Sequence, residues 1–114
     1  MSELLVMSKL SHPNIIKLIG ASDMAPRLCL VMELCDCSLF DLLYKRKRTH
    51  PLTKKEKVAF CLDIANGIGY LHCNCRPPII HRDIKSMNIL YSPNGCMKIC
   101  DFGIVQVIFS KQFL

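Results

Sequence analysis

The chain has 114 residues, so its length favours one small domain. Hydrophobic residues make up 51% of it, which excludes a disordered tail, and no apolar run approaches the roughly 20 residues that cross a bilayer. The net charge of +6 is concentrated in two basic runs, within residues 45–48 and 54–57. No aromatic residues interleave with these charges, so we interpret them as a solvated connection between helices rather than a nuclear-localisation or nucleic-acid patch.

The eight cysteines indicate either a disulfide framework, a metal site or ordinary reduced thiols. The N-terminal sequence MSELLVMSKL contains Glu3 and lacks the unbroken apolar segment of a secretory signal, so we expect reduced thiols in the cytoplasm, with the nucleus as the alternative. A zinc site would be built from Cys35, Cys37, His72, Cys73 and Cys75. Because their C-x-C spacing differs from the usual C-x-x-C, we expect the thiols to act mostly as small apolar residues.

The first elements are a helix and two strands. Apolar residues at helical spacing predict a helix over residues 3–10, which Pro13 ends. The sequences NIIKLIGA (residues 14–21) and RLCLVME (residues 27–33) are typical of strands. The short polar turn between them favours an antiparallel pair.

Two helices are expected next. Ser38 is a candidate N-cap with Asp41 three residues later, which predicts a short helix ending in the basic run. Thr53 and Glu56 fit a capping box at the start of a longer helix that ends before Pro77. The apolar stripe predicted for this longer helix consists of Val58, Cys61, Ala65, Ile68 and Leu71.

Short apolar segments then predict extended structure at residues 79–80, 88–91 and 96–100. The dipeptide Asn94-Gly95 lies between the last two, and it is a strong hairpin signal because both residues tolerate positive φ. A hairpin brings its two flanks together, so polar groups on those flanks should converge at one end.

The groups on these flanks are Asp83, Lys85, Asn88 and Asp101. Two carboxylates and an amide supply the oxygen ligands that Mg²⁺ prefers, and a carboxylate near a metal can also accept a proton from a hydroxyl. Lys85 adds positive charge that would stabilise a developing phosphate charge. The set therefore predicts phosphoryl transfer, although either aspartate alone would be interpreted as an exposed turn residue.

The motif HRDIKSMN at residues 81–88 resembles the catalytic loop of eukaryotic protein kinases, H-R-D-x-x-x-x-N, and DFG at residues 101–103 resembles their metal-binding motif. The spacing of the two motifs, with a hairpin between them, fits the family. HPNIIKLIG (residues 12–20) resembles the turn and strand after the kinase αC helix, and LCLVMEL (residues 28–34) resembles the strand that enters the hinge. Lys85 and the surrounding sequence are most similar to serine/threonine kinases of the tyrosine-kinase-like group.

This resemblance implies an α+β fold that is a partial protein kinase domain over residues 1–114. Residues 1–33 would be a small-lobe remnant with the end of αC and two antiparallel strands, and residues 34–37 the hinge. Residues 38–114 would begin the mainly helical large lobe, with the catalytic-loop hairpin.

The resemblance also implies a role for each polar residue. Asp83 would be the catalytic base and Lys85 would neutralise charge on the transferred phosphoryl group. Asn88 and Asp101 would hold Mg²⁺ on the phosphates of ATP. Arg82 would pair with a phosphorylated activation loop.

The nucleotide base would be bound by a second group of residues. Met32 stands at the gatekeeper position, the backbone of Glu33, Leu34 and Cys35 would hold adenine, and Leu90 would pack under its ring. The apolar stack called the regulatory spine in this family would consist of Met7, Leu18, His81 and Phe102. Ordinary core packing is the alternative interpretation for these apolar side chains.

The sequence also departs from the family pattern. No G-x-G-x-x-G or VAIK-like lysine precedes Glu3, which stands where the αC glutamate would, and no A-P-E follows Gly103. We therefore expect a serine/threonine kinase recorded as a fragment, with ATP and a Ser/Thr-containing protein as partners and neither nucleic acid nor membrane. Little or no activity is expected from the isolated chain. The alternatives are a catalytically inactive kinase-like binding module and the zinc-binding cysteine module.

Overall fold

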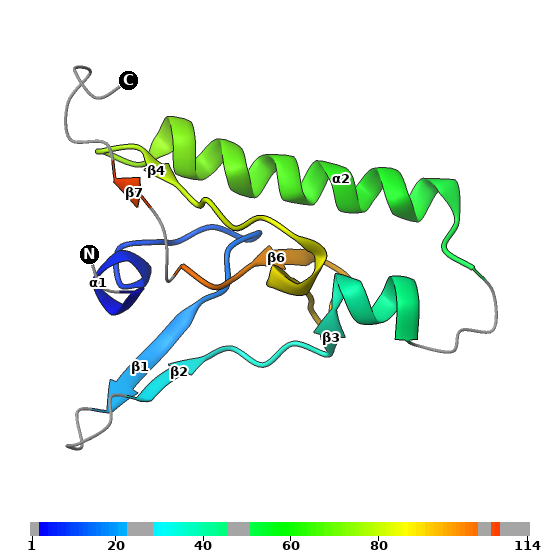
Figure 1. The fold of residues 1–114 in the computed structure, drawn as a ribbon, viewed down its shortest axis with the longest axis horizontal. Helices are drawn as coiled ribbons and strands as arrows, with labels where there is room; N and C mark the ends of the chain where they lie inside the picture. Colours follow the sequence, from blue (N-terminus) through cyan, green and yellow to red (C-terminus); the bar gives the residue numbers. More distant parts are fainter. Residues whose placement is uncertain (1–2, 23–28, 46–50, 103–105, 108–114) are drawn as a thin grey trace.

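The structure is a computed structural model, and it describes residues 3–22, 29–45, 51–102 and 106–107. The helical elements are α1 (Glu3–Met7), the π-helical η1 (Asp41–Lys45), α2 (Lys54–Gly69), the π-helical η2 (Tyr70–Asn74) and the 3₁₀-helical η3 (Ser86–Asn88). The strands are β1 (Leu18–Ser22), β2 (Cys29–Met32), β3 (Cys37–Ser38), β4 (Ile79–Ile80), β5 (Ile89–Tyr91), β6 (Met97–Ile99) and β7 (Gln106–Val107). Figure 1 shows β6 between α2 and the β1–β2 pair.

The predicted antiparallel pair of strands is confirmed, because β1 pairs with β2 from Leu18 opposite Met32 to Ser22 opposite Cys29. β1 is shorter than the predicted strand over residues 14–21. The preceding residues instead join the later hairpin: Ile99 N–H donates to Asn14 O at 2.9 Å, and Ile16 N–H donates to Ile99 O at 2.9 Å. The backbone groups of that segment therefore have partners far along the chain.

The first helix also ends earlier than the prediction over residues 3–10. α1 ends at Met7, and the N–H groups of Lys9 and Leu10 donate to carbonyls three residues back, Val6 O and Met7 O, each at 3.2 Å. Bonds of this kind tighten the last turn of a helix.

The capping box at the start of α2 is confirmed. Thr53 Oγ1 accepts from Glu56 N–H at 3.1 Å, and Thr53 N–H donates to Glu56 Oε1 at 3.1 Å. A similar pair starts the shorter helix, where Asp41 N–H donates to Ser38 Oγ at 3.1 Å. Ser38 also ends β3, whose pairing with β5 the sequence did not predict.

The buried face of α2 differs from the predicted stripe. Val58 is 54% exposed, Cys61 and Ala65 are also exposed, and the buried residues of α2 are Phe60 and Gly67. Gly67 decides the orientation, since a Cβ there would lie 2.8 Å from Ile99 Cδ1 and 2.9 Å from Asn14 O. At Gly67 the helix backbone lies close against the hairpin. This orientation leaves most of the predicted apolar stripe exposed.

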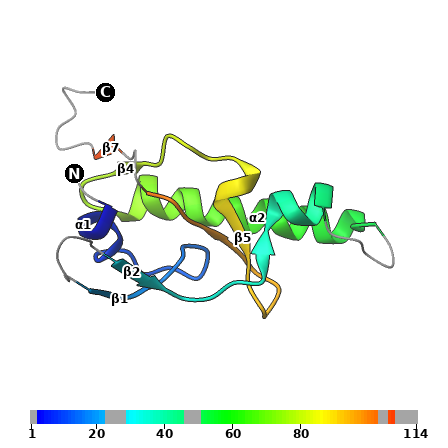
Figure 2. The same ribbon diagram turned by 60° about the horizontal axis from the view of Figure 1, so that its bottom comes forward.

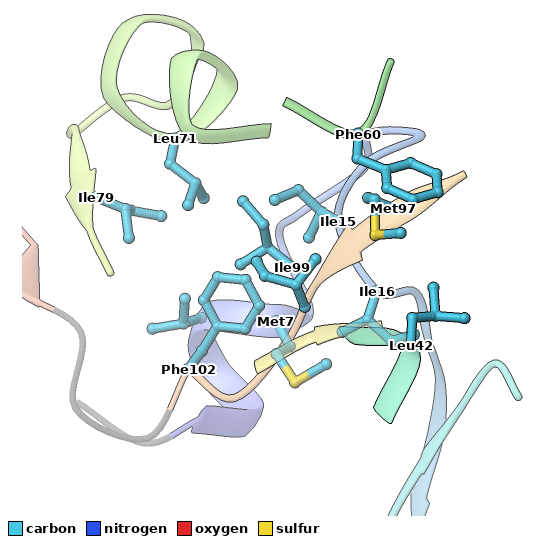
Figure 3. Close-up of a cluster of buried hydrophobic side chains, with 12 residues drawn as sticks. Met7, Ile15, Ile16, Leu42, Phe60, Leu71, Ile79, Met97, Ile99 and Phe102 are labelled. Atoms are coloured by element: carbon cyan, nitrogen blue, oxygen red, sulfur yellow. The ribbon is translucent and has the colours of Figure 1, made fainter. Parts of the chain in front are cut away.

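The core lies where α1, the hairpin and the α2–η2 helix meet. Figure 3 shows Leu71 of η2, Ile99 of β6, Met7 of α1 and Phe102 in one cluster. In Figures 1 and 2, α2 lies beside β6 of the hairpin. β4 follows η2 and pairs with β7, a contact that the sequence did not predict. Among the described helices, none combines the length and apolar character needed to span a bilayer.

Candidate functional site

The predicted hairpin around Asn94-Gly95 is confirmed. β5 and β6 pair antiparallel, and Ser92 N–H donates to Cys96 O at 2.9 Å to close the turn. Gly95 has a φ of 87°, in the left-handed region that favours glycine. Ser92 Oγ is hydrogen-bonded to Asn94 Oδ1 and also accepts from Cys96 N–H at 3.1 Å, so the turn is held by its own side chains.

At the other end of this hairpin, three of the predicted site residues come together. The side-chain Nδ2 of Asn88 donates to Asp83 O at 3.0 Å and to Asp83 Oδ2 at 3.1 Å. Across the hairpin, Cys100 N–H donates to Asn88 O at 3.0 Å, so Asp101 follows directly after a residue bonded to Asn88. The predicted convergence of Asp83, Asn88 and Asp101 therefore matches the backbone geometry.

Two residues of this region have strained backbones. Arg82 has a φ of 73° and Asp101 a φ of 60°, and neither is glycine. Left-handed conformations are uncommon for residues with a Cβ, and they concentrate at sites where function requires a particular side-chain direction. These conformations change the direction of the backbone immediately before Asp83 and at Asp101 itself.

His81 connects the two flanks from beneath. It is buried, its Nδ1 accepts from Asp83 N–H at 3.1 Å, and its Nε2 lies 2.7 Å from Cys100 O. Because Nδ1 accepts, Nε2 carries the proton that is donated to the carbonyl, which assigns one neutral tautomer. The ring also meets the buried Phe102 ring edge-on, with centroids 5.0 Å apart.

Lys85 and Asp83 form a loose ion pair at the surface. Lys85 Nζ lies 3.7 Å from Asp83 Oδ1, and more than half of the lysine side chain is exposed. Exposed pairs of this kind contribute little to stability, about 0–1 kcal/mol. The arrangement leaves one carboxylate oxygen and one ammonium group side by side at the surface.

The donor set fits a magnesium ion that is shared with a phosphate ligand. The Nδ2 of Asn88 is used on Asp83, and among the described residues no donor is bonded to its amide oxygen. Asp101 is exposed and adds a carboxylate at the same end of the hairpin. Mg²⁺ is usually bound by one or two protein oxygens together with substrate phosphates and water, so a larger cage of carboxylates is not required.

Within the described part of the chain, no group of three or more His, Cys, Asp and Glu side chains is placed to hold a metal ion. This part includes all five residues of the zinc alternative, which are Cys35, Cys37, His72, Cys73 and Cys75. The zinc alternative thus receives no support from the geometry.

The segment predicted to hold adenine connects β2 to β3. Met32 ends β2 and is exposed, Leu34 is 88% exposed, and Glu33 and Cys35 are half-buried. Burial raises the pKa of the Cys35 thiol, and the nearby Glu33 carboxylate raises it further. Leu90 is half-buried in β5, opposite Ser38 of β3.

The residues of the predicted spine fall in or against the core. Met7, His81 and Phe102 are buried, and Leu18 is partly buried and packed against the same cluster. Figure 3 shows Met7 beside Phe102. The side chain of Glu3, and Gly103 with the residues of the predicted activation segment other than 106–107, lie outside what the structure describes.

Sequence reasoning missed two polar side chains that attach β6 to its surroundings. Asn14 Nδ2 donates to Met97 O at 2.9 Å, and Asp63 Oδ2 accepts from Met97 N–H at 3.0 Å. No local signal could have found them, because their partners are 83 and 34 residues away along the chain.

Residues 1–113 match the family described as "Protein kinase domain". The chain belongs to the protein kinase family. It is 41% identical to the serine/threonine-protein kinase CTR1 of Arabidopsis thaliana over 103 residues, which are 90% of this chain and 12% of that protein. It is 43% identical to the putative serine/threonine-protein kinase/receptor R826 of Acanthamoeba polyphaga mimivirus over 106 residues, 92% of this chain and 6% of that protein.

This kinase chain thus spans a small part of its relatives, and the predicted partial kinase domain with an α+β fold is confirmed. A third relative, the serine/threonine-protein kinase STY46 of Arabidopsis thaliana, is 41% identical over 92% of this chain and 18% of that protein.

Proposed function

We propose that the chain carries part of the catalytic centre of an ATP-dependent protein kinase that phosphorylates serine and threonine. In this proposal, residues 1–33 belong to the small lobe, residues 34–37 to the hinge and residues 38–114 to the large lobe. The supporting observation is that Asn88 binds the Asp83 carboxylate with its side chain and the residue before Asp101 with its backbone.

Asp83 is the proposed catalytic base. Its Oδ2 accepts from Asn88 Nδ2 at 3.1 Å, which fixes the orientation of the carboxylate. A substrate hydroxyl bound against this group would lose its proton to the carboxylate as the oxygen attacks phosphorus. Lys85, 3.7 Å away, would offset negative charge on the transferred phosphoryl group.

Asn88 and Asp101 are the proposed magnesium ligands, through the amide oxygen of the first and the carboxylate of the second. When bound, Mg²⁺ neutralises the negative charge of the ATP phosphates. The left-handed φ of Asp101 supports this role, since strained conformations of this kind concentrate at functional sites. His81 would hold the proposed base and the residue before Asp101 in register through its bonds to Asp83 N–H and Cys100 O.

Adenine would lie against the segment from Met32 to Cys35, with Leu90 packed under the ring. Leu34 is 88% exposed, so a ligand could reach the middle of this segment. Aromatic bases bind well in such places when an apolar floor and backbone hydrogen-bonding groups coincide.

A chimeric kinase tests this proposal. The segment of the CTR1 kinase domain that aligns with this chain would be replaced by this chain's residues, and transfer of phosphate from Mg·ATP to a generic protein substrate would be measured. We expect phosphoserine and phosphothreonine as products. Asp83→Asn should lower the rate by about 10²–10⁴-fold, the range of a general base.

A soluble chimera that binds ATP but transfers no phosphate would contradict the proposal and favour the inactive binding module. The isolated 114-residue chain should itself show little transfer, because its sequence contains no glycine-rich loop or accompanying lysine to hold the α- and β-phosphates. Strong activity of the isolated chain that Asp83→Asn abolishes would overturn that expectation.

A further inference from the structure

Lys98 lies in the middle of β6, the strand that leads to Asp101, and most of its side chain is covered by the protein. Its side chain is only 13% exposed. The Nζ atom donates to Pro13 O at 3.0 Å and lies 3.1 Å from Glu33 Oε1. A lysine on a short strand would ordinarily extend into solvent, so this inward placement calls for a physical reason.

Its partner Glu33 is also fixed in more than one way. Glu33 Oε1 accepts from Lys17 N–H at 2.9 Å, and Glu33 N–H donates to Lys17 O at 3.0 Å. The carboxylate therefore points back toward the start of β1 and toward β6. It is 28% exposed, so the pair is screened less than a surface ion pair.

The same connecting segment is attached to the hairpin at its other end. Asp36 N–H donates to Tyr91 O at 2.8 Å, and Cys37 of β3 pairs with Tyr91 of β5. The segment is thus bonded to β5 at one end and to β6 at the other. Lys98 also stands directly opposite Leu90, so their side chains share one face of the hairpin.

We infer that Lys98 is a positioning residue for nucleotide binding. Its bond to Glu33 fixes the segment proposed to hold adenine at a set distance from Asn88 and Asp101 on the same hairpin. This inference rests on the proposed function. Lys98 contacts neither the proposed catalytic base nor the proposed metal ligands, so it acts only through Glu33 and the strand.

The inference predicts that a change at Lys98 affects the affinity for Mg·ATP and the affinity for adenosine differently. Adenosine contacts only one end of the site and needs no fixed distance between the ends. Mg·ATP must contact both ends at once, so it loses affinity when the distance between them varies. A purely structural role for Lys98 would instead change the two affinities together.

Isothermal titration calorimetry on the CTR1 chimera described above would measure the dissociation constants of Mg·ATP and adenosine for four proteins. These are the wild type, Lys98→Met, Lys98→Arg and the exposed-lysine control Lys57→Met. For Lys98→Met we expect Mg·ATP to bind roughly tenfold more weakly, equivalent to about 1.4 kcal/mol, with adenosine changed less than about twofold. Lys98→Arg keeps the charge and should restore most of the Mg·ATP affinity, and Lys57→Met should behave as wild type.

Equal losses for both ligands, or no loss for Lys98→Met, would overturn the inference while leaving the proposed function intact. A chimera with the wild-type segment that binds neither ligand would contradict the proposed function itself. If circular dichroism shows that Lys98→Met is unfolded, Glu33→Gln replaces it, because the amide oxygen can still accept from Lys17 N–H while the ion pair is lost. The same selective loss of Mg·ATP affinity is then required.

Discussion

Single residues define this site through the directions of their hydrogen bonds. Asn88 uses its amide nitrogen on Asp83 and its backbone carbonyl on Cys100, so one residue joins the two flanks of the hairpin. His81 does the same from below with its two ring nitrogens. Because both side chains are buried, their orientations are fixed by the fold before any ligand binds.

The thiol of Cys35 offers a prediction at this scale. Burial and then the Glu33 carboxylate raise its pKa above the ordinary 9.0, so less of it is thiolate at a given pH. At pH 8 we expect iodoacetamide to modify Cys35 more slowly than the exposed Cys29 and Cys73, as followed by peptide mass spectrometry. Its rate should rise only at higher pH. Modification of Cys35 as fast as Cys73 would contradict the assignment.

Among the elements, α2 and the hairpin show which features are determined by local sequence and which by contacts between distant residues. The capping box of Thr53 and Glu56 and the turn at Gly95 follow from local sequence, and both were predicted correctly. The apolar stripe was predicted wrongly at Val58, Cys61 and Ala65, which are exposed, and correctly at Leu71, which is buried. The close contact of Gly67 with the hairpin, which sequence periodicity does not show, accounts for the difference. Helix periodicity shows which positions are apolar, but it does not show which of them pack against another element of the fold.

Two glycines of α2 test this packing directly. Gly67→Ala would place a Cβ 2.8 Å from Ile99 Cδ1 and 2.9 Å from a backbone oxygen of Asn14, so we expect the free energy of unfolding to fall by about 1–3 kcal/mol. Gly69→Ala meets no atom within 4 Å and should raise it by about 0.4–1 kcal/mol. Urea denaturation measures both. Effects of the same sign would mean that Gly67 does not set the approach of helix and hairpin.

For the whole molecule, the site is built by segments that meet only after folding. The sequence motifs identified Asp83, Asn88 and Asp101, since each lies close to the predicted hairpin. The sequence did not predict the pairing of β3 with β5 or the bond between Glu33 and Lys98, because no local pattern links residues so far apart. Those contacts place the proposed adenine segment next to the hairpin.

The exposed side of α2 leads to a prediction about association. Val58 and Leu62 are 54% and 59% exposed, and Cys61 and Ala65 of the same helix are exposed as well. An apolar face of this kind favours self-association of the isolated chain. Leu62→Glu should shift sedimentation velocity profiles toward monomer, with the free energy of unfolding changed by less than about 0.5 kcal/mol. An unchanged distribution of sedimenting species would show that this face does not drive association.

The central claim is that Asn88 and Asp101 hold a magnesium ion on the phosphates of ATP. Calorimetric titration of the CTR1 chimera with ATP, in Mg²⁺ and in EDTA, tests it most directly when the wild-type segment is compared with Asp101→Asn. We predict that Mg²⁺ tightens ATP binding to the wild type, and that Asp101→Asn loses this gain while adenosine affinity is unchanged. ATP binding that is equally tight with and without Mg²⁺, or a full magnesium effect in Asp101→Asn, would contradict the claim.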